Sequence, residues 1–104
     1  MPIIENIREK IEIDLFEFSK HAVDQIIIRH ISVQDVRRVI AHGIIIENYP
    51  EDKYVPSSLI FGMTAERRPI HIQCSYPSRP IIKIITLYEP NPTRWIDFKK
   101  RRLR

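Results

Sequence analysis

The chain has 104 residues, of which 43% are hydrophobic and 29% are charged, and its formal net charge is +4. Such a chain has room for one modest hydrophobic core, which predicts a single domain over residues 1–104 with a core at about 16–98. The one cysteine, Cys74, excludes a disulfide framework and a Cys-based metal site. The N-terminus lacks the basic and apolar regions of a signal peptide, and no apolar run reaches the ~18 residues of a membrane span. We therefore expect a cytoplasmic protein that does not contact a membrane.

Positive charge is concentrated at the C-terminus. Residues 94–104 hold six Lys and Arg side chains against one Asp, a net charge of +5, which leaves −1 for residues 1–93. A basic tail can hold phosphates without reading a base sequence. The expected nucleic-acid contacts are Lys99, Lys100, Arg101, Arg102 and Arg104. The alternative is a solvated tail at 99–104 that only keeps the protein in solution.

The N-terminal part has the pattern of helices. Isoleucines recur at helical spacing over residues 3–11, which predicts an amphipathic helix. Residues 13–18 suit either a short strand or an extended link. Ser19 is a good N-cap, because its hydroxyl can accept a free backbone N–H, and it predicts a second helix at about 20–29.

A third helix and four strands are predicted next. Ser32-Val33-Gln34-Asp35 has the pattern of a capping box, and Gly43 is a typical residue at the end of a helix. The expected strands are 44–49, 58–64, 70–76 and 81–88. Their short links, rich in turn residues, favour an antiparallel meander, because parallel pairs need long crossovers.

The last hairpin and the C-terminus complete the expected fold. Folding about residues 77–79 pairs Ile72 with Ile84 and Ile70 with Thr86, which gives an apolar face for the helices to cover. Thr93 is expected to cap a short helix after the last strand. The sequence thus predicts an α+β fold: two to three N-terminal helices on one face of a four-stranded antiparallel sheet, with a short C-terminal helix.

Candidate functional side chains lie on the second helix. His21, Gln25 and Arg29 are spaced i, i+4 and i+8, beside the apolar stripe of this helix. Histidine can act as a general acid or base near neutral pH, and arginine can hold a phosphate with two parallel hydrogen bonds. The alternative is that His21 stabilises the start of the helix and Arg29 pairs with an acid.

Further candidates lie on the predicted strands. Thr86 and Tyr88 point to the same face of the last strand, where a phenol could donate to a phosphate and a threonine could position it. Cross-strand packing is the alternative, and for Thr86 it is the favoured one. His71 is a reserve candidate. Glu47 is interpreted, with its acidic neighbours at 51–52, as a solvated charge of a turn.

Other kinds of site are not expected. The four histidines show no metal-ligand spacing with Cys74 or with clustered carboxylates, so no metal is expected. Glycine occurs only at Gly43 and Gly62, which excludes a phosphate loop, and no cofactor is expected.

Several segments together resemble a known family. They are Phe18-Ser19-Lys20-His21-Ala22, Arg29 followed by Ile31-Ser32, Val36 to Gly43, Glu47-Asn48-Tyr49-Pro50, the strand at 59–62, Arg68-Pro69-Ile70-His71, and Ile84-Ile85-Thr86-Leu87-Tyr88-Glu89-Pro90. In order and spacing they resemble the small bacterial proteins classified as domain of unknown function 4258, over roughly residues 16–98. Gln25 stands where that family often carries an arginine.

The resemblance implies an α+β domain similar to the RelE-like ribonuclease toxins, with His21, Arg29, Thr86 and Tyr88 as its polar signature. The expected function is metal-independent cleavage of RNA, with His21 as acid/base, Arg29 as phosphate clamp and Tyr88 as donor. The alternative is a non-catalytic module that binds a protein or a nucleic acid and regulates it. The partners expected are RNA, an antitoxin-like protein, or a second copy bound through the N-terminal helix at 3–11.

Overall fold

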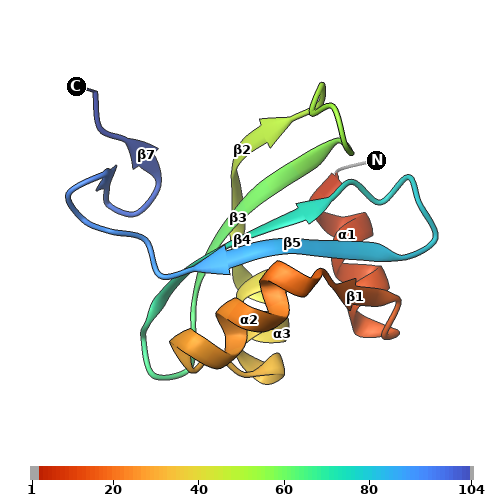
Figure 1. Cartoon of the computed structure of the whole chain (residues 1–104), viewed down its shortest axis with the longest axis horizontal. Coiled ribbons are helices and arrows are strands. Elements are labelled where there is room, and N and C mark those ends of the chain that lie inside the picture. Colours follow the sequence, from red (N-terminus) through yellow and green to blue (C-terminus); the bar gives the residue numbers. More distant parts are fainter. Residues whose placement is uncertain (1–2, 104) are drawn as a thin grey trace.

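The computed structural model describes residues 3–103, which form three helices, a five-stranded sheet and a separate two-stranded hairpin (Figure 1). The helices are α1 (Ile3–Glu12), α2 (Lys20–Arg29) and α3 (Val33–His42). The strands are β1 (Phe16–Phe18), β2 (Ile44–Tyr49), β3 (Ser57–Met63), β4 (Pro69–Ser75), β5 (Ile82–Tyr88), β6 (Trp95–Ile96) and β7 (Lys100–Arg101). The predicted α+β class and the three helices are confirmed.

The helices begin where their capping residues predict. The hydroxyl of Ser19 accepts the N–H of Ala22 at 3.0 Å at the start of α2. At the start of α3, Ser32 and Asp35 each accept the other's backbone N–H, which is the complete capping box. Helix α2 ends at His30 in the left-handed conformation, with φ 53°. None of the helices described is both long and apolar enough to cross a membrane.

The sheet has the strand order β1-β5-β4-β3-β2, and β1 pairs with β5 in parallel, whereas the other pairs are antiparallel. The predicted four-stranded antiparallel sheet is therefore wrong by one strand. Residues Phe16–Phe18 pair with β5 from Ile82 to Ile84. A strand of three residues is too short to show an alternating pattern, and its partner lies far along the chain.

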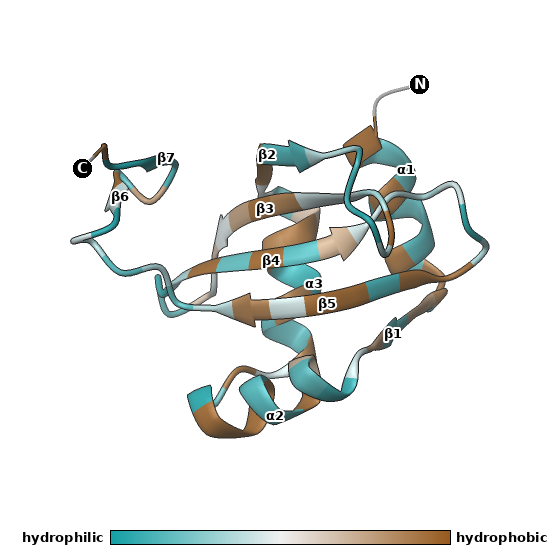
Figure 2. Ribbon diagram, turned by 45° about the horizontal axis from the view of Figure 1, so that its top comes forward, coloured by the Kyte–Doolittle hydropathy of each residue, from teal (hydrophilic) through white to brown (hydrophobic). Residues whose placement is uncertain are grey.

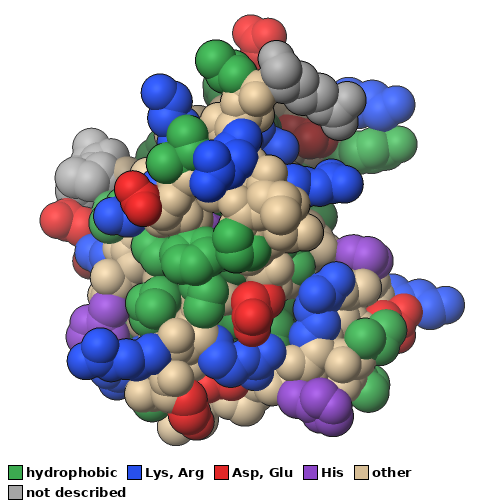
Figure 3. Space-filling model, turned by 90° about the vertical axis from the view of Figure 1, so that its left-hand side faces the viewer, with side chains coloured by type: hydrophobic (Ala, Val, Ile, Leu, Met, Phe, Trp, Pro, Cys, Tyr) green, Lys and Arg blue, Asp and Glu red, His purple; other side chains and the backbone are tan. Residues whose placement is uncertain are grey.

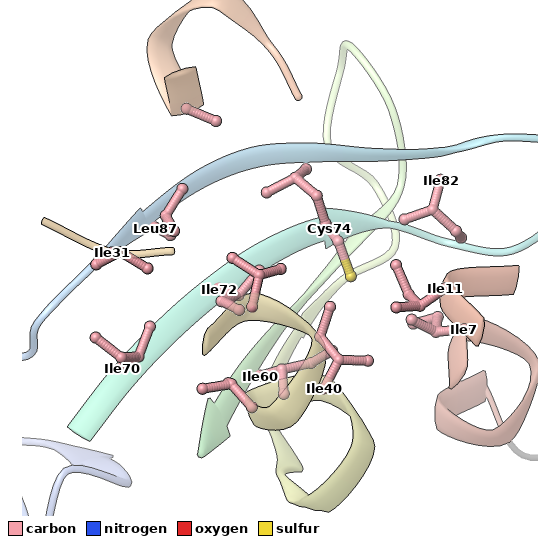
Figure 4. Packing of buried hydrophobic residues seen from close by; sticks show 14 residues of the cluster. Ile7, Ile11, Ile31, Ile40, Ile60, Ile70, Ile72, Cys74, Ile82 and Leu87 are labelled. Carbon is pink, nitrogen blue, oxygen red and sulfur yellow. The ribbon is translucent and has the colours of Figure 1, made fainter. Parts of the chain in front are cut away.

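The helices cover one face of the sheet, and the hydrophobic core lies between the helices and this face (Figure 4). Helix α1 contributes Ile7 and Ile11, both buried, so its apolar stripe is used inside the chain's own core. The sheet contributes the buried side chains of Ile70, Ile72, Cys74, Ile82 and Ile84. In Figure 2 the central strands are accordingly brown over much of their length, while β7 is hydrophilic.

The register of the β4–β5 pair differs from the expected one. Ile72 lies opposite Leu87, not Ile84, and Cys74 lies opposite Ile84. The expected register put Cys74 opposite Ile82, so the pairing is already shifted by two residues next to the loop. An irregularity between Gln73 and Cys74, where β5 holds an extra residue, adds the third. In a regular strand Ile84 and Leu87, three positions apart, would face opposite sides of the sheet. The extra residue between them lets both side chains face the helices.

Two glycines allow α3 to lie directly on β3. A Cβ atom on Gly62 would lie 2.7 Å from the carbonyl oxygen of Val39 and 3.0 Å from its Cα. On Gly43 it would lie 2.3 Å from the same oxygen and 2.5 Å from the oxygen of Phe61. These contacts are with backbone, so no side-chain rotation could relieve them. The glycines therefore set the distance between helix and sheet.

The predicted C-terminal helix is wrong, because residues 95–101 form a hairpin. Strands β6 and β7 pair antiparallel, and the turn between them has positive φ at Asp97 (51°) and Phe98 (61°). Two successive residues in this conformation give the twist of a tight hairpin turn. The hairpin stands at the end of the sheet where β5 finishes (Figure 1).

Candidate functional site

His71 is the centre of an aromatic cluster on the sheet face that the helices leave free. It is completely buried, and Tyr88 and Phe61 lie directly opposite it on β5 and β3. Trp95 from the hairpin covers it edge-on, with 4.5 Å between the ring centres. Phe98 packs against Phe61 at 6.1 Å. The hairpin is thus held on the sheet by contacts around one imidazole.

The hydrogen bonds of His71 fix its tautomer. Its Nε2 lies 2.5 Å from the carbonyl oxygen of Phe98, which can only accept, so Nε2 carries the proton. Nδ1 must then accept, and the hydroxyl of Tyr88, at 3.2 Å, donates to it. Burial lowers the pKa of His71 and raises the pKa of Tyr88, so both groups are held neutral.

An ion pair joins the hairpin to β2. Arg101 donates from Nε and Nη2 to the two carboxylate oxygens of Glu47, at 2.8 and 3.1 Å. Its guanidinium also lies over the ring of Trp95, 4.7 Å from the ring centre. Burial opposes ionisation of Glu47, but the hydrogen bonds from Arg101 and Tyr49 outweigh it and lower the pKa of Glu47. Burial, together with the bond to Glu47, raises the pKa of Tyr49 to about 12.

A hollow of about 260 Å³ opens between the end of α2, the end of β5 and the hairpin. Its lining residues are Arg29, Tyr88, Glu89, Asn91, Arg94, Trp95 and Arg101. Three arginine residues therefore line one small space. The Nε of Arg29 donates to the side chain of Gln25 at 2.6 Å. Because both residues lie on α2, this bond orients the guanidinium of Arg29. Figure 3 views this side of the molecule, where Lys and Arg side chains surround hydrophobic ones beneath the hairpin.

The structure brings together two of the four residues that the family signature contains. Arg29 and Tyr88 line the same hollow. Thr86 pairs with Gln73 on the same face as Tyr88 but does not line the hollow. His21 is exposed in the first turn of α2, and at 1.5 Å per residue it lies roughly 12 Å along the helix from Arg29.

The basic side chains of residues 99–102 lie in different surroundings. Lys99 lines a second hollow on the β3 side, and Lys100 is exposed on β7. Arg101 is bonded to Glu47, and the Nε of Arg102 donates to the carbonyl oxygen of Pro92 at 2.9 Å. Arg104, also expected to contact nucleic acid, lies outside the described residues.

Several residues of the site were not expected from the sequence. Arg94, Trp95 and Glu89 were not proposed as site residues, and Glu47 is not a solvated charge of a turn, because it lies in β2 and binds Arg101. One signal was present: alternation along β2 puts Glu47 and Tyr49 on one face. No sequence pattern pointed to the contact between Glu47 and Arg101.

Comparisons with known proteins give one match. Residues 18–89 match the model of the family described as Domain of unknown function (DUF4258). Neither the curated proteins nor the solved structures contain a match. Within residues 3–103, no three His, Cys, Asp or Glu side chains lie close enough together to hold a metal ion.

Proposed function

Because the chain belongs to the family described as Domain of unknown function (DUF4258), whose name assigns no activity, we propose a function from the geometry of the site. We propose that the protein binds single-stranded RNA and that the small hollow holds a phosphate of its backbone. The observation that carries this proposal is the convergence of Arg29, Arg94 and Arg101 beside Trp95 and Tyr88.

The three guanidinium groups have free donors. Arg29 uses only its Nε, for Gln25, and Arg101 uses Nε and Nη2, for Glu47. A guanidinium carries five N–H bonds, so each keeps donors for a phosphate oxygen. The present bonds of Arg29 and Arg101 also restrict how these two side chains move, which lowers the entropy lost on binding.

The polar groups beside the arginines favour RNA over DNA. Glu89 lines the hollow, and its Oε1 accepts from Arg68 at 3.1 Å, which leaves its other oxygen as an acceptor. A 2′-hydroxyl can donate to such an acceptor, and DNA has none to offer. Trp95 and Tyr88 add aromatic surface of the kind on which unpaired bases stack.

Binding is a better-supported function than catalysis by the family signature residues. The proton of Tyr88 is directed to His71, so the phenol is not a free donor to a phosphate in this arrangement. His21 does not line the hollow.

Cleavage of RNA is a second candidate, favoured by Glu89 alone. As a carboxylate in the same hollow as three arginine residues, it could take the proton of the 2′-hydroxyl that attacks the phosphorus. The bond from phosphorus to the 5′-oxygen then breaks, the 5′-oxygen leaves with a proton from solvent, and a 2′,3′-cyclic phosphate remains. Incubation of RNA with the wild type in excess chelator tests this, and loss of any cleavage in Glu89→Gln, but not in His21→Ala, is the expected pattern.

The binding proposal is tested by fluorescence anisotropy of a labelled single-stranded RNA. Arg29→Ala/Arg94→Ala should weaken binding and reduce the salt dependence by about 0.7 for each RNA phosphate that the variant no longer neutralises. The matched control is Lys53→Ala/Arg79→Ala, which removes two exposed cations from loops at the opposite end of the sheet. Equal affinity of both variants would contradict the proposal, as would equal affinity of the wild type for DNA of the same base sequence.

A further inference from the structure

A second and larger hollow lies on the other side of the hairpin. It measures about 610 Å³ and opens where α3 ends, β2 begins and β3 ends. The side chains that matter for its chemistry are Arg38, His42, Ile44, Phe61, Met63, Arg67 and Lys99.

The larger hollow is positively charged. Arg38, Arg67 and Lys99 line it, and no Asp or Glu does. Across residues 3–103 none of these three side chains makes an ion pair or a hydrogen bond. This differs from the small hollow, where Arg101 is bonded to Glu47 and Glu89 is part of the lining. The three cations of the larger hollow are therefore fully available to an anion.

The floor of the larger hollow is apolar. Ile44 and Met63 are 49% and 40% exposed, and the half-buried Phe61 also lines the hollow. Apolar surface next to unpaired cations suits a ligand with a flat apolar part and a phosphate, and free phosphate would use only the cations. A nucleotide has both parts.

The two hollows lie along one row of the sheet. Tyr88, at the small hollow, is opposite His71, which is opposite Phe61, which is opposite Ile44. Tyr88 and Phe61 are thus two strand spacings apart, roughly 10 Å. The hairpin stands above the row between them and contributes a cation to each side, Arg101 to one and Lys99 to the other.

We infer that the larger hollow is a second nucleotide site for the same RNA strand. A base lies on Phe61 and Met63, and the phosphate beside it lies between Arg38, Arg67 and Lys99. The strand passes from one hollow to the other around the hairpin. This inference rests on the proposed function, and it adds to it a binding path of several nucleotides.

The test compares four proteins by anisotropy with one labelled single-stranded RNA of about 12 nucleotides, within the range that one small domain covers. They are the wild type, Arg29→Ala/Arg94→Ala for the small hollow, Arg38→Ala/Lys99→Ala for the larger one, and the control Lys53→Ala/Arg79→Ala. Each hollow variant should bind about tenfold more weakly or worse, as expected when a hydrogen bond to a charged group is removed. All the replaced side chains are exposed, and thermal melts will verify that the variants are folded.

The outcomes separate the two claims. If Arg38→Ala/Lys99→Ala binds like the control while the small-hollow variant is weakened, the inference is wrong and the proposed function stands. If no variant differs from the wild type, or if RNA does not bind at all, both are wrong. If only the larger-hollow variant is weakened, the continuous path and the role of the small hollow are both refuted.

Discussion

Tyr88→Phe separates a structural role for this phenol from a role in binding phosphate. The substitution keeps the ring and removes only the hydroxyl, which donates to Nδ1 of His71. Because His71 is completely buried, no water can replace that donor without a rearrangement. We therefore expect Tyr88→Phe to destabilise the fold.

The size of the effect follows from the geometry. An acceptor left unpaired in the protein interior costs about 1–3 kcal/mol. For a domain of this size each kcal/mol lowers Tm by about 4–8 °C. A tyrosine hydroxyl that only faced solvent would change the free energy of unfolding by no more than about 0.5 kcal/mol. The difference is well within the resolution of a denaturant or thermal melt.

A double-mutant cycle assigns the effect to the bond with His71. In the His71→Phe background the acceptor is absent, so Tyr88→Phe should be neutral or slightly stabilising there. Tyr54→Phe is the matched control, because Tyr54 is 81% exposed. If Tyr88→Phe is as mild as Tyr54→Phe, or equally destabilising in both backgrounds, the hydrogen bond to His71 is not what holds this part of the fold.

Three further outcomes are expected. Gly62→Ala should destabilise by about 1–3 kcal/mol in urea melts, since its Cβ would press on the backbone of Val39; an unchanged midpoint would contradict the close packing of α3 on β3. Ser32→Ala should cost about 1 kcal/mol through loss of the capping box, and equal stability would show that α3 does not depend on this cap. The folded-state pKa of His71 is lowered, so below its ordinary value of 6.5 the unfolded chain binds a proton that the folded chain does not. Stability should therefore fall with pH below about 6.5, by at most about 1.4 kcal/mol per pH unit, and His71→Phe should flatten this dependence. A wild-type stability that rises on acidification there would refute the buried neutral imidazole.

Local signals predicted much of the fold. The caps at Ser19 and Ser32 located two helices, because a cap depends on residues within one turn of its own position. The antiparallel strands β2 to β5 were found from runs of apolar residues between turns. Residues 13–18 were left open between a strand and an extended link, and the hairpin was missed, because each strand is short and is stabilised by partners distant in the sequence. Phe98, a bulky residue at positive φ, gives no sign of a turn in the sequence.

The sequence also singled out some of the residues that line the small hollow. Arg29 and Tyr88 were singled out as candidates, and the structure places them around one hollow. The role of His71 was not predictable, since the sequence around a strand histidine shows neither its tautomer nor which residues pack over its ring. The pairing of Glu47 with Arg101 joins β2 to the hairpin, and only the folded chain brings these two segments together.

The central claim is that RNA binds at the hairpin end of the sheet, and mapping by NMR tests it most directly. Titration of single-stranded RNA into the labelled protein should shift the amide signals of Arg29, of residues 88–101, and of the β3 end near Phe61. Signals of the loops that hold Lys53 and Arg79 should stay in place. Shifts that cluster at those loops instead, or that do not appear at saturating RNA, would contradict the claim.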